Sequence, residues 1–334
     1  MVSPHKIISA LRTKAVLPLL ILGGMAFASF LPPFLPSAYA RGPFRVACWN
    51  VENLFDTIPA PHGDDADFTP DGSYHWDARR YWSKLGRLSR TLSGMGGAEP
   101  CALIGLVEVE NDSVIYDLTR RTSLARLGYE AFLSHGPDVR GINVALLYQP
   151  LLFQPVSHDT LRVAPLTPET RPTRDILHVA GRLITGDTLD VFVVHLPSRR
   201  GGKAADRYRL AVTQALAACA DSIQRQRTVP LVLMMGDFNA PASDPVFRTS
   251  LSAYTPLTSS LPGTYYFRQE WSQIDHFVVG DTLIRRFAPD ASVYKAPHLL
   301  RATDTDSIPK RTFLGTYYQG GLSDHLPIIL NLSL

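Results

Sequence analysis

The chain has 334 residues, of which 45% are hydrophobic and 19% charged, with 33 Lys and Arg against 30 Asp and Glu. Three of the basic residues (Lys6, Arg12 and Lys14) fall within the first forty positions, which contain no acidic residue. The remaining 294 residues therefore carry 30 basic and 30 acidic side chains. This balance gives no evidence for a nucleic-acid-binding surface, and the length suits one large α/β domain with a sizeable core.

Residues 1–40 have the pattern of a secretory signal peptide. Basic residues precede an apolar stretch over 15–35, and the small residues of 37–40 form a cleavage site before Arg41. Prolines and a Gly-Gly pair interrupt the apolar stretch, which argues against an uncleaved membrane anchor. We therefore expect a signal peptide over 1–40, a mature domain over 41–334, export to the periplasm or the exterior, and no stable membrane insertion after cleavage.

Three cysteines in an exported chain are too few for a disulfide framework. Cys48 and Cys101 fall in apolar segments expected to be strands, and Cys219 falls on an apolar helix face. The odd number leaves at least one thiol free. A Cys48–Cys101 bridge and two separate buried thiols are the alternatives, and the sequence favours the buried thiols.

In the first half of the chain, apolar segments typical of strands alternate with segments whose apolar residues recur at helical spacing. A strand is expected at Phe44–Trp49, followed by a long surface loop over 56–77 whose acids do not have the spacing of a calcium-binding loop. Asp77 is the expected N-cap of a helix ending near Gly94. A buried strand at 101–109 precedes a second helix, which Asn111 or Asp112 can cap and whose apolar face extends to Leu127.

The rest of the chain is expected to be richer in strands. The expected elements are strands at 129–135, 142–148 and 152–156, a hairpin of 176–184 and 188–195, a helix at 204–227, a strand ending at Asp237, a mostly irregular stretch at 240–271, a strand at 274–279, an irregular stretch at 297–321, and a closing strand at 325–332. No repeat of fixed period is present. This mixture predicts an α/β (α+β) fold, a four-layer sandwich of two packed mixed β-sheets flanked by helices.

Polar side chains follow several of the apolar runs. The stretch Met234–Asn239 reads Met-Met-Gly-Asp-Phe-Asn, so Asp237 and Asn239 come at the end of a buried strand. Other run ends carry further acids, amides and histidines: Asn50, Glu108, His195, Asp275, His276, Asp324 and His325. Each one alone has an ordinary structural explanation as a turn or strand-end residue. Their repeated placement predicts one shared site.

These residue types suit divalent-metal chemistry at a phosphate. Carboxylate and amide oxygens are ligands for Mg²⁺ or Mn²⁺, and they also allow Ca²⁺, whereas the set lacks the Cys and clustered His that favour zinc. Carboxylates gathered without a cation would repel one another, so a shared metal explains their coexistence. The two histidines add groups that can donate hydrogen bonds or protons to a phosphoryl oxygen.

Six segments in chain order resemble the motifs of the endonuclease/exonuclease/phosphatase superfamily. They are Trp49-Asn-Val-Glu-Asn-Leu-Phe55, Leu106-Val-Glu-Val-Glu-Asn111, Val194-His-Leu-Pro-Ser-Arg199, Gly236-Asp-Phe-Asn239, Ile274-Asp-His276 and Leu322-Ser-Asp-His-Leu-Pro327. The resemblance covers residues 44–332 and is to the branch related to pancreatic deoxyribonuclease. The ordered set is specific for the superfamily but not for a substrate.

The resemblance implies roles for eight residues. Glu108 would hold the divalent metal, with help from Asn50 and Asp324. Asp237 would orient or deprotonate the attacking water, while Asn239 and His195 stabilise phosphoryl oxygens and His325, paired with Asp275, acts at the phosphate. Four further residues are expected to bind the substrate: Arg140, Asn143, Arg174 and Arg199. Relatives often carry Asp at the place of Asn143, and both Arg174 and Arg199 have ordinary surface arginines as their alternative.

The leading hypothesis is therefore a metal-dependent phosphodiesterase, and within that class an endonuclease that acts on nucleic acid. The protein is expected to be a monomer. A phosphatase or a sphingomyelinase-like phospholipid phosphodiesterase is the enzymatic alternative, since fold and metal site do not fix the substrate. Aromatic residues at 265–267 and 317–318 fit either a lipid surface or stacked bases. A binding module without activity is disfavoured, because it would be expected to have lost the residues that the motifs retain.

Overall fold

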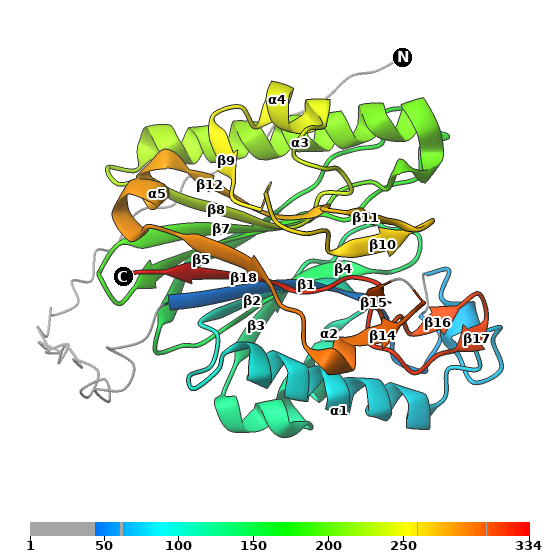
Figure 1. Ribbon diagram of the computed structural model, residues 1–334. Helices are drawn as coiled ribbons and strands as arrows, with labels where there is room; N and C mark the ends of the chain where they lie inside the picture. The colour runs from blue at the N-terminus through cyan, green and yellow to red at the C-terminus, as the bar shows by residue number, and fades with distance from the viewer. Residues whose placement is uncertain (1–43, 61–62, 259, 305) are drawn as a thin grey trace, which may run out of the picture.

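The computed structural model describes residues 44–60, 63–258, 260–304 and 306–334, so the expected signal peptide lies outside the described residues. Two six-stranded sheets dominate these residues (Figure 1). The first sheet has the order β13 (Asp290–Val293), β18 (Ile328–Leu332), β1 (Phe44–Leu54), β2 (Leu103–Val109), β4 (Asn143–Tyr148) and β3 (Glu130–Leu133). The second has the order β5 (Phe153–Leu161), β6 (Ile176–Leu183), β7 (Thr188–His195), β8 (Leu231–Asp237), β12 (Asp275–Gly280) and β9 (Tyr254–Pro256).

Both sheets are mixed. In the first sheet β1 and β2 run parallel, as do β7 and β8 in the second, while the other neighbours are antiparallel. The helices are α1 (Ala78–Met95), α2 (Asp112–Arg120), α3 (Gly202–Gln226), α4 (Pro245–Ser250) and α5 (Asp281–Phe287). Figure 1 shows α3 on the outer side of one sheet and α1 and α2 on the outer side of the other. The expected fold class, two packed mixed sheets with flanking helices, is confirmed.

Three apolar clusters hold these layers together. One joins α1 and α2 to the first sheet and includes Leu88 of α1 and Leu106 of β2. The second lies between the two sheets and includes Val46 and Leu233, and the third joins α3 to the second sheet through Leu216 and neighbouring side chains. Burying one face of each helix and both faces of the central strands is the main driving force for this arrangement.

The expected helix caps are present. The Asp77 side chain accepts a hydrogen bond from the Arg80 amide at the start of α1, and Asn111 accepts one from the Val114 amide at the start of α2. However, α2 ends at Arg120, and Leu127 belongs to a separate 3-10 turn, η2 (Ser123–Leu127). Thr122 caps that turn by accepting from the Leu124 amide, which separates it from the helix.

Two stretches expected to be irregular contain short elements. Residues 240–271 include α4, β9 and most of the hairpin of β10 (Tyr265–Phe267) and β11 (Glu270–Ser272). Residues 297–321 contain the 3-10 turn η4 (Pro297–Leu299) and two small hairpins: β14 (Leu300–Ala302) with β15 (Ser307–Pro309), and β16 (Phe313–Leu314) with β17 (Tyr317–Tyr318). These segments are too short to show a hydrophobic period.

The loop over 56–77 is more buried than expected. Trp76 is 1% exposed and donates through its indole N–H to the Phe55 carbonyl, while η1 (Ala66–Phe68) lies within the loop. Asp65 is buried and accepts from the Ala60 amide, so this acid is not a solvated loop residue. The loop therefore adds an aromatic layer beside the start of α1.

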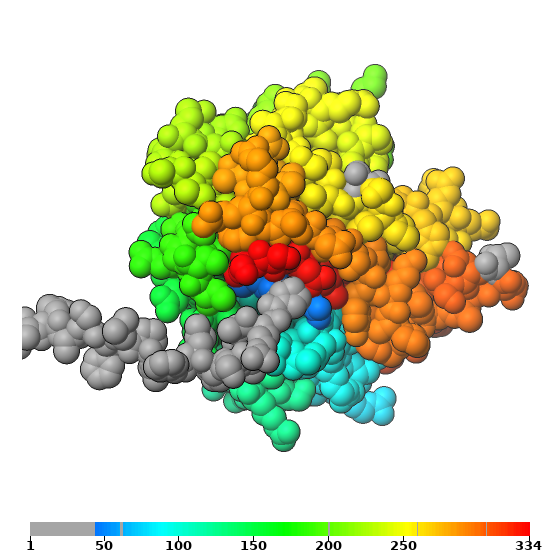
Figure 2. Space-filling model, turned by 60° about the vertical axis from the view of Figure 1, so that its left-hand side comes forward, coloured from blue at the N-terminus to red at the C-terminus, as the bar shows by residue number. Residues whose placement is uncertain are grey.

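Other expectations concern single residues and the surface. Cys48, Cys101 and Cys219 are all free, which agrees with buried thiols and excludes the Cys48–Cys101 bridge in this structure. Figure 2 shows the C-terminal segment at the surface between the segment containing β13 and the start of β1, as the strand order requires. Among the described residues, no helix is both long and apolar enough to cross a bilayer.

Candidate active site

Irregularities in two neighbouring strands, β1 and β2, affect the segments that carry Asn50 and Glu108. The register of β1 with β2 shifts between Asn50 and Leu54, and that of β2 with β4 shifts around Glu108. Glu52, Asn53 and Glu108 adopt positive φ values of 50°, 48° and 68°. A bulge redirects a side chain, and left-handed non-glycine residues are a feature of functional sites. The Glu108 Oε2 atom then accepts from the Asn53 amide at 2.8 Å.

Three strands of the second sheet place further groups side by side. In the ladder, Asp237 pairs with His195 on one side and with Asp275 on the other. The preceding residue, Gly236, has φ +147°, and a Cβ atom there would lie 1.9 Å from the Val194 carbonyl oxygen. Glycine is therefore required for the close approach of β7 and β8. Asn50 Nδ2 donates to Asp237 Oδ2 at 3.1 Å and so links the two sheets at the site.

His325 enters the same site from the segment before β18. Its Nδ1 atom lies 2.8 Å from Asp275 Oδ2, and its Nε2 atom lies 3.9 Å from Asp237 Oδ2. The Thr264 hydroxyl donates to the same Asp275 oxygen, which fixes that carboxylate. Burial disfavours the charged form of His325, but the negative charges of Asp275 and then Asp237 favour that form more strongly. The pKa of His325 therefore lies well above its usual value. His325 is therefore a cation at neutral pH.

His195 has the opposite electrostatic character. Its Nε2 atom lies 3.6 Å from Asp237 Oδ2 and 3.9 Å from Glu108 Oε1, while its buried Nδ1 atom has no hydrogen-bond partner among the described residues. Burial, reinforced by Arg174 and Arg140, lowers the pKa of His195 well below its usual value. His195 is therefore neutral, and a proton on Nε2 would face the carboxylates. Burial also raises the pKa of Asp237 to about 7.

Asn239 follows Asp237 with a left-handed φ of 50°. Its amide N–H donates to Asp237 Oδ1 at 2.8 Å, and its side-chain Nδ2 donates to the Leu196 carbonyl at 2.9 Å. Asp324 Oδ1 lies 4.0 Å from His325 Nε2. One linked region thus contains eight sequence-predicted residues: Asn50, Glu108, His195, Asp237, Asn239, Asp275, Asp324 and His325. His276 does not belong to it, because its ring nitrogens bond to Thr258 Oγ1 and the Ala240 carbonyl beneath the sheet.

The four expected substrate-binding residues lie in different environments. Arg140 is partly exposed, with its guanidinium 3.7 Å from Glu108 Oε1, so it borders the site. Arg174 is buried and donates to Asp138 and to the Leu196 carbonyl, and no described residue bonds to its Nε. Asn143 is also buried, and its side chain bonds to the backbone of Gly136, Glu110 and Gly141. Arg199 is exposed in the 3-10 turn η3 (Arg199–Gly201).

The proposed metal ligands do not form the tightest acidic group. Among the described residues, that group is Asp237, Asp275 and His325, whose ligand atoms lie within 4.8 Å of one another. His325 Nδ1 is already hydrogen-bonded to Asp275, however, and His325 is cationic. Glu108 and Asp324 retain 12% and 18% side-chain exposure, so their carboxylate oxygens are partly open to solvent. This oxygen donor set fits a magnesium-like ion better than the histidine cluster does.

Three residues near the site were not singled out from the sequence. Glu52 belongs to the recognised Trp49–Phe55 motif, and Lys84 interrupts the apolar face of α1, four residues before Leu88. A lysine at a core position of an amphipathic helix is a usable signal. Arg311 lies in the stretch expected to be irregular and had no comparable signal.

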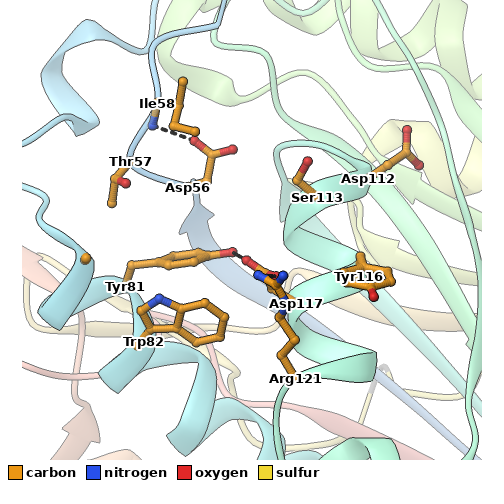
Figure 3. Close-up of a pocket in the computed structure, with 11 residues that line it drawn as sticks. Asp56, Thr57, Ile58, Tyr81, Trp82, Asp112, Ser113, Tyr116, Asp117 and Arg121 are labelled. Atoms are coloured by element: carbon orange, nitrogen blue, oxygen red, sulfur yellow. Dashed lines mark hydrogen bonds and ion pairs between the residues drawn. The ribbon is translucent and has the colours of Figure 1, made fainter.

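A separate pocket of about 580 Å³ lies between the starts of α1 and α2 (Figure 3). Its acids already have partners: the Tyr81 hydroxyl donates to Asp117, and Asp56 accepts from the Ile58 amide. Asp112 lies 2.8 Å from the His135 ring. The pocket contains none of the residues that the sequence analysis placed in the active site.

The chain matches the model of the endonuclease/exonuclease/phosphatase family over residues 45–333. It therefore belongs to this family, whose members include metal-dependent nucleases and phosphodiesterases, are typically hydrolases of phosphoester bonds, and generally use a divalent metal. No curated protein matches the sequence.

Solved structures share the fold at low sequence identity. The catalytic domain of human Nocturnin with bound sulfate is 17% identical with a TM-score of 0.55, covering 87% of this chain and 94% of its own. Truncated TDP2 from Caenorhabditis elegans is 14% identical with a TM-score of 0.59, covering 87% and 98%. A family protein from Bacteroides thetaiotaomicron is 14% identical with a TM-score of 0.56, covering 86% and 97%.

Proposed function

We propose that the protein is a divalent-metal-dependent phosphodiesterase that cleaves nucleic acid internally by in-line attack of an activated water. The observation that carries this proposal is the contact of His325 with Asp275 at 2.8 Å, with the other nitrogen of the same ring facing Asp237. A charged imidazole beside a buried carboxylate supplies a proton donor and a water-orienting group in one place.

Asp237 is the residue that orients or deprotonates the attacking water. Its Oδ1 accepts from the Asn239 amide and its Oδ2 from Asn50, so its direction is fixed from two sides. Cationic His325 then stabilises the charge that builds on the phosphoryl group. Neutral His195 adds an N–H donor at the same place. Preorganised donors of this kind act at the developing charge without rearrangement.

Glu108 and Asp324, with the amide oxygen of Asn50, would hold the divalent cation, for which Mg²⁺ or Mn²⁺ is the best match and Ca²⁺ is compatible. A cation bound there would supply Lewis-acid stabilisation of a phosphoryl oxygen. Arg140 contributes a guanidinium at the edge of this site, 3.7 Å from Glu108. Its 41% side-chain exposure leaves it accessible to a substrate phosphate.

The hairpin of β10 and β11 supports a nucleic-acid substrate. The Tyr265 ring lies against the His325 ring with a centroid distance of 4.7 Å, and Phe267, which is 45% exposed, lies parallel to Tyr265 further out. Aromatic faces next to a scissile phosphate suit stacked bases. A phosphatase or phospholipid phosphodiesterase is the second candidate. Leu314 and Tyr317, 52% and 78% exposed at the β16–β17 turn, favour a lipid surface.

The test compares hydrolysis of plasmid DNA, RNA, sphingomyelin and a nitrophenyl phosphodiester, each with Mg²⁺ and with EDTA. Asp237→Asn is the matched control because it keeps size and removes the proposed base. Nicking of plasmid DNA that needs Mg²⁺ and is lost in Asp237→Asn is the expected result. Preferential hydrolysis of sphingomyelin would move the assignment to the lipid-cleaving alternative. Activity retained in EDTA would contradict metal dependence, and binding without any hydrolysis would support the inactive module.

A further inference from the structure

A buried ionic network lies behind the proposed metal ligands and has no role in the chemistry described above. Lys84 is 1% exposed on α1, and its ammonium donates to the Glu52 carbonyl at 2.5 Å and to Thr312 Oγ1 at 2.9 Å. The Thr312 amide in turn donates to Glu52 Oε2 at 2.6 Å. An ammonium buried without such partners would be strongly destabilising, so these contacts fix the Glu52 backbone and side chain together.

Arg311 connects this network to the active site. One of its terminal nitrogens donates to Asp324 Oδ2. Its Nε lies 3.6 Å from Glu52 Oε1 and has no hydrogen-bond partner in the part of the chain that the structure describes. The planar guanidinium therefore spans two carboxylates that would otherwise repel each other. With Oδ2 occupied, the second oxygen, Asp324 Oδ1, lies 4.0 Å from His325 Nε2. That oxygen is the one directed toward the catalytic groups.

The backbone around Arg311 is held on both sides. The Gly321 amide donates to the Arg311 carbonyl at 3.1 Å, and the Leu322 amide donates to the Lys310 carbonyl at 3.0 Å. A Cβ atom at Gly321 would lie 1.8 Å from the Lys310 carbonyl oxygen, so the two chain segments can be this close only with glycine. Because residue 322 leads directly to Asp324, Arg311 and its carboxylate partner belong to one rigid loop base.

We propose that Arg311 is a positioning residue for the metal site: it holds Asp324 Oδ2 so that Oδ1 is presented to the divalent cation, with Glu52 and Lys84 as its anchor. The inference rests on the proposed function, because it assumes that Asp324 is a metal ligand. Hydrogen bonds to a ligating carboxylate orient it, and loss of such a partner costs roughly 10–100-fold in metal affinity. An arginine matters here because its fork contacts both carboxylates at once, whereas a lysine supplies a single point charge.

Charge and orientation predict opposite effects, which makes the proposal testable. Removing a cation from an acidic site should strengthen metal binding if Arg311 only balances charge. Removing an orienting partner should weaken it. Arg311→Gln therefore separates the two explanations by the direction of change, and Arg311→Lys, which keeps the charge and loses the fork, should resemble Arg311→Gln only if orientation matters.

The experiment measures Mn²⁺ binding to the protein without substrate, from the electron paramagnetic resonance signal of free Mn²⁺. We expect both Arg311 variants to raise the dissociation constant by about 10–100-fold. Lys310→Gln removes a charge at the neighbouring position and is expected to leave the constant unchanged. Thermal unfolding of each variant verifies that it is folded. If Arg311→Gln does not fold, Arg311→Lys alone decides the outcome, because unchanged affinity in that variant overturns the positioning role.

Two comparisons complete the test. In an Asp324→Asn background, Arg311→Lys should cause little further loss if the arginine acts through this carboxylate, whereas an undiminished loss overturns that route. Glu108→Gln is measured in parallel. If Glu108→Gln weakens Mn²⁺ binding and the Arg311 variants do not, the positioning role is wrong and the metal site stands. If Glu108→Gln and Asp324→Asn both leave binding unchanged, the proposed metal site itself is wrong.

Discussion

At the scale of single residues, His195 and His325 allow the most direct test of the proposed mechanism. His325 is held as a cation by Asp275, and neutral His195 faces Asp237 and Glu108. We expect His325→Ala and His195→Ala each to lower turnover by ~10²–10⁴-fold, the range for a positioned acid–base group. Steady-state kinetics at saturating Mg²⁺ measures this, and Mn²⁺ affinity should change far less.

The alternative hypothesis is that the cation binds to the compact group of Asp237, Asp275 and His325. If His325→Ala abolished metal binding while excess metal restored full turnover, His325 would be a ligand and the cation would lie in that group. Asp275→Asn is the matched variant, because it keeps the hydrogen-bonding shape and removes the charge that holds His325 protonated. It should reproduce most of the loss seen in His325→Ala if the imidazolium charge is what matters.

A second residue-scale prediction concerns Glu108, whose Oε2 is oriented by the Asn53 amide. Glu108→Gln keeps the size of the side chain and removes one negative charge. The Mg²⁺ affinity should therefore fall about 10-fold or more, as when other contacts at a metal site are lost, while the protein remains folded. The measurement is the Mg²⁺ concentration giving half-maximal hydrolysis, with thermal unfolding as the control. Unchanged metal dependence would show that another residue is the principal ligand.

The sequence predicted those site residues that belong to local motifs. Gly236-Asp-Phe-Asn239 and Ser323-Asp-His325 carry their chemistry within a few positions, so their types and order were readable without coordinates. Burial was not readable: Arg174 and Asn143 are enclosed and hydrogen-bonded to the protein rather than open to a substrate. Arg311 was not predicted because its side chain joins Asp324 to Glu52, which is 259 positions away from Arg311 in the chain.

At the scale of elements, long strands and helices were predictable, but short ones were not. The strand β7 begins and ends where its apolar run does, at Thr188 and His195, and α3 closely follows its amphipathic stretch. The hairpins β10–β11 and β16–β17 have two or three residues in each strand, so tertiary contacts rather than a hydrophobic period define them. These same hairpins supply Tyr265 and adjoin Arg311, next to the site.

The element-scale prediction is that the end of β8 depends on Gly236. In Gly236→Ala the new Cβ would meet the Val194 carbonyl, so the strand must shift or strain. We expect a loss of about 1–3 kcal/mol in the free energy of unfolding, as for overpacked sites. Gly86→Ala in α1 is the control. Apart from the backbone of its own helix and its chain neighbours, no atom of the described residues would lie within 4 Å of the new Cβ, and a helical alanine should add ~0.5–1 kcal/mol. Urea unfolding of both variants checks the pair, and equal effects would contradict the steric argument.

At the scale of the whole molecule, the N-terminal segment predicts the cellular location. The basic residues, apolar stretch and small residues at 37–40 lead us to propose cleavage after Ala40 and export. N-terminal sequencing of protein isolated from its native source should then begin at or near Arg41. Finding Met1 or Val2 retained in the functional protein would contradict the proposal.

The stability of the whole molecule should also respond to acid through a buried histidine outside the catalytic set. His276 is 0% exposed, and burial lowers its pKa from 6.5 to about 4. The unfolded chain therefore binds more protons than the folded chain between those two pH values, and stability contributed by neutral His276 is lost as pH falls through this window. Burial raises the pKa of Glu52, Glu110 and Asp237 to about 7, which acts in the opposite direction.

A comparison with His276→Gln separates this contribution, because the raised carboxyl groups are common to both proteins and cancel in the difference. The variant retains an amide that can bond to the Ala240 carbonyl or the Thr258 hydroxyl, the two partners of the imidazole. As pH falls from about 6.5 to about 4, wild-type protein should lose ~3 kcal/mol relative to the variant, at ~1.4 kcal/mol per pKa unit. Urea unfolding at a series of pH values measures this difference. A difference that stays constant across the window would mean that His276 does not change its protonation between the folded and unfolded states in the way its burial requires.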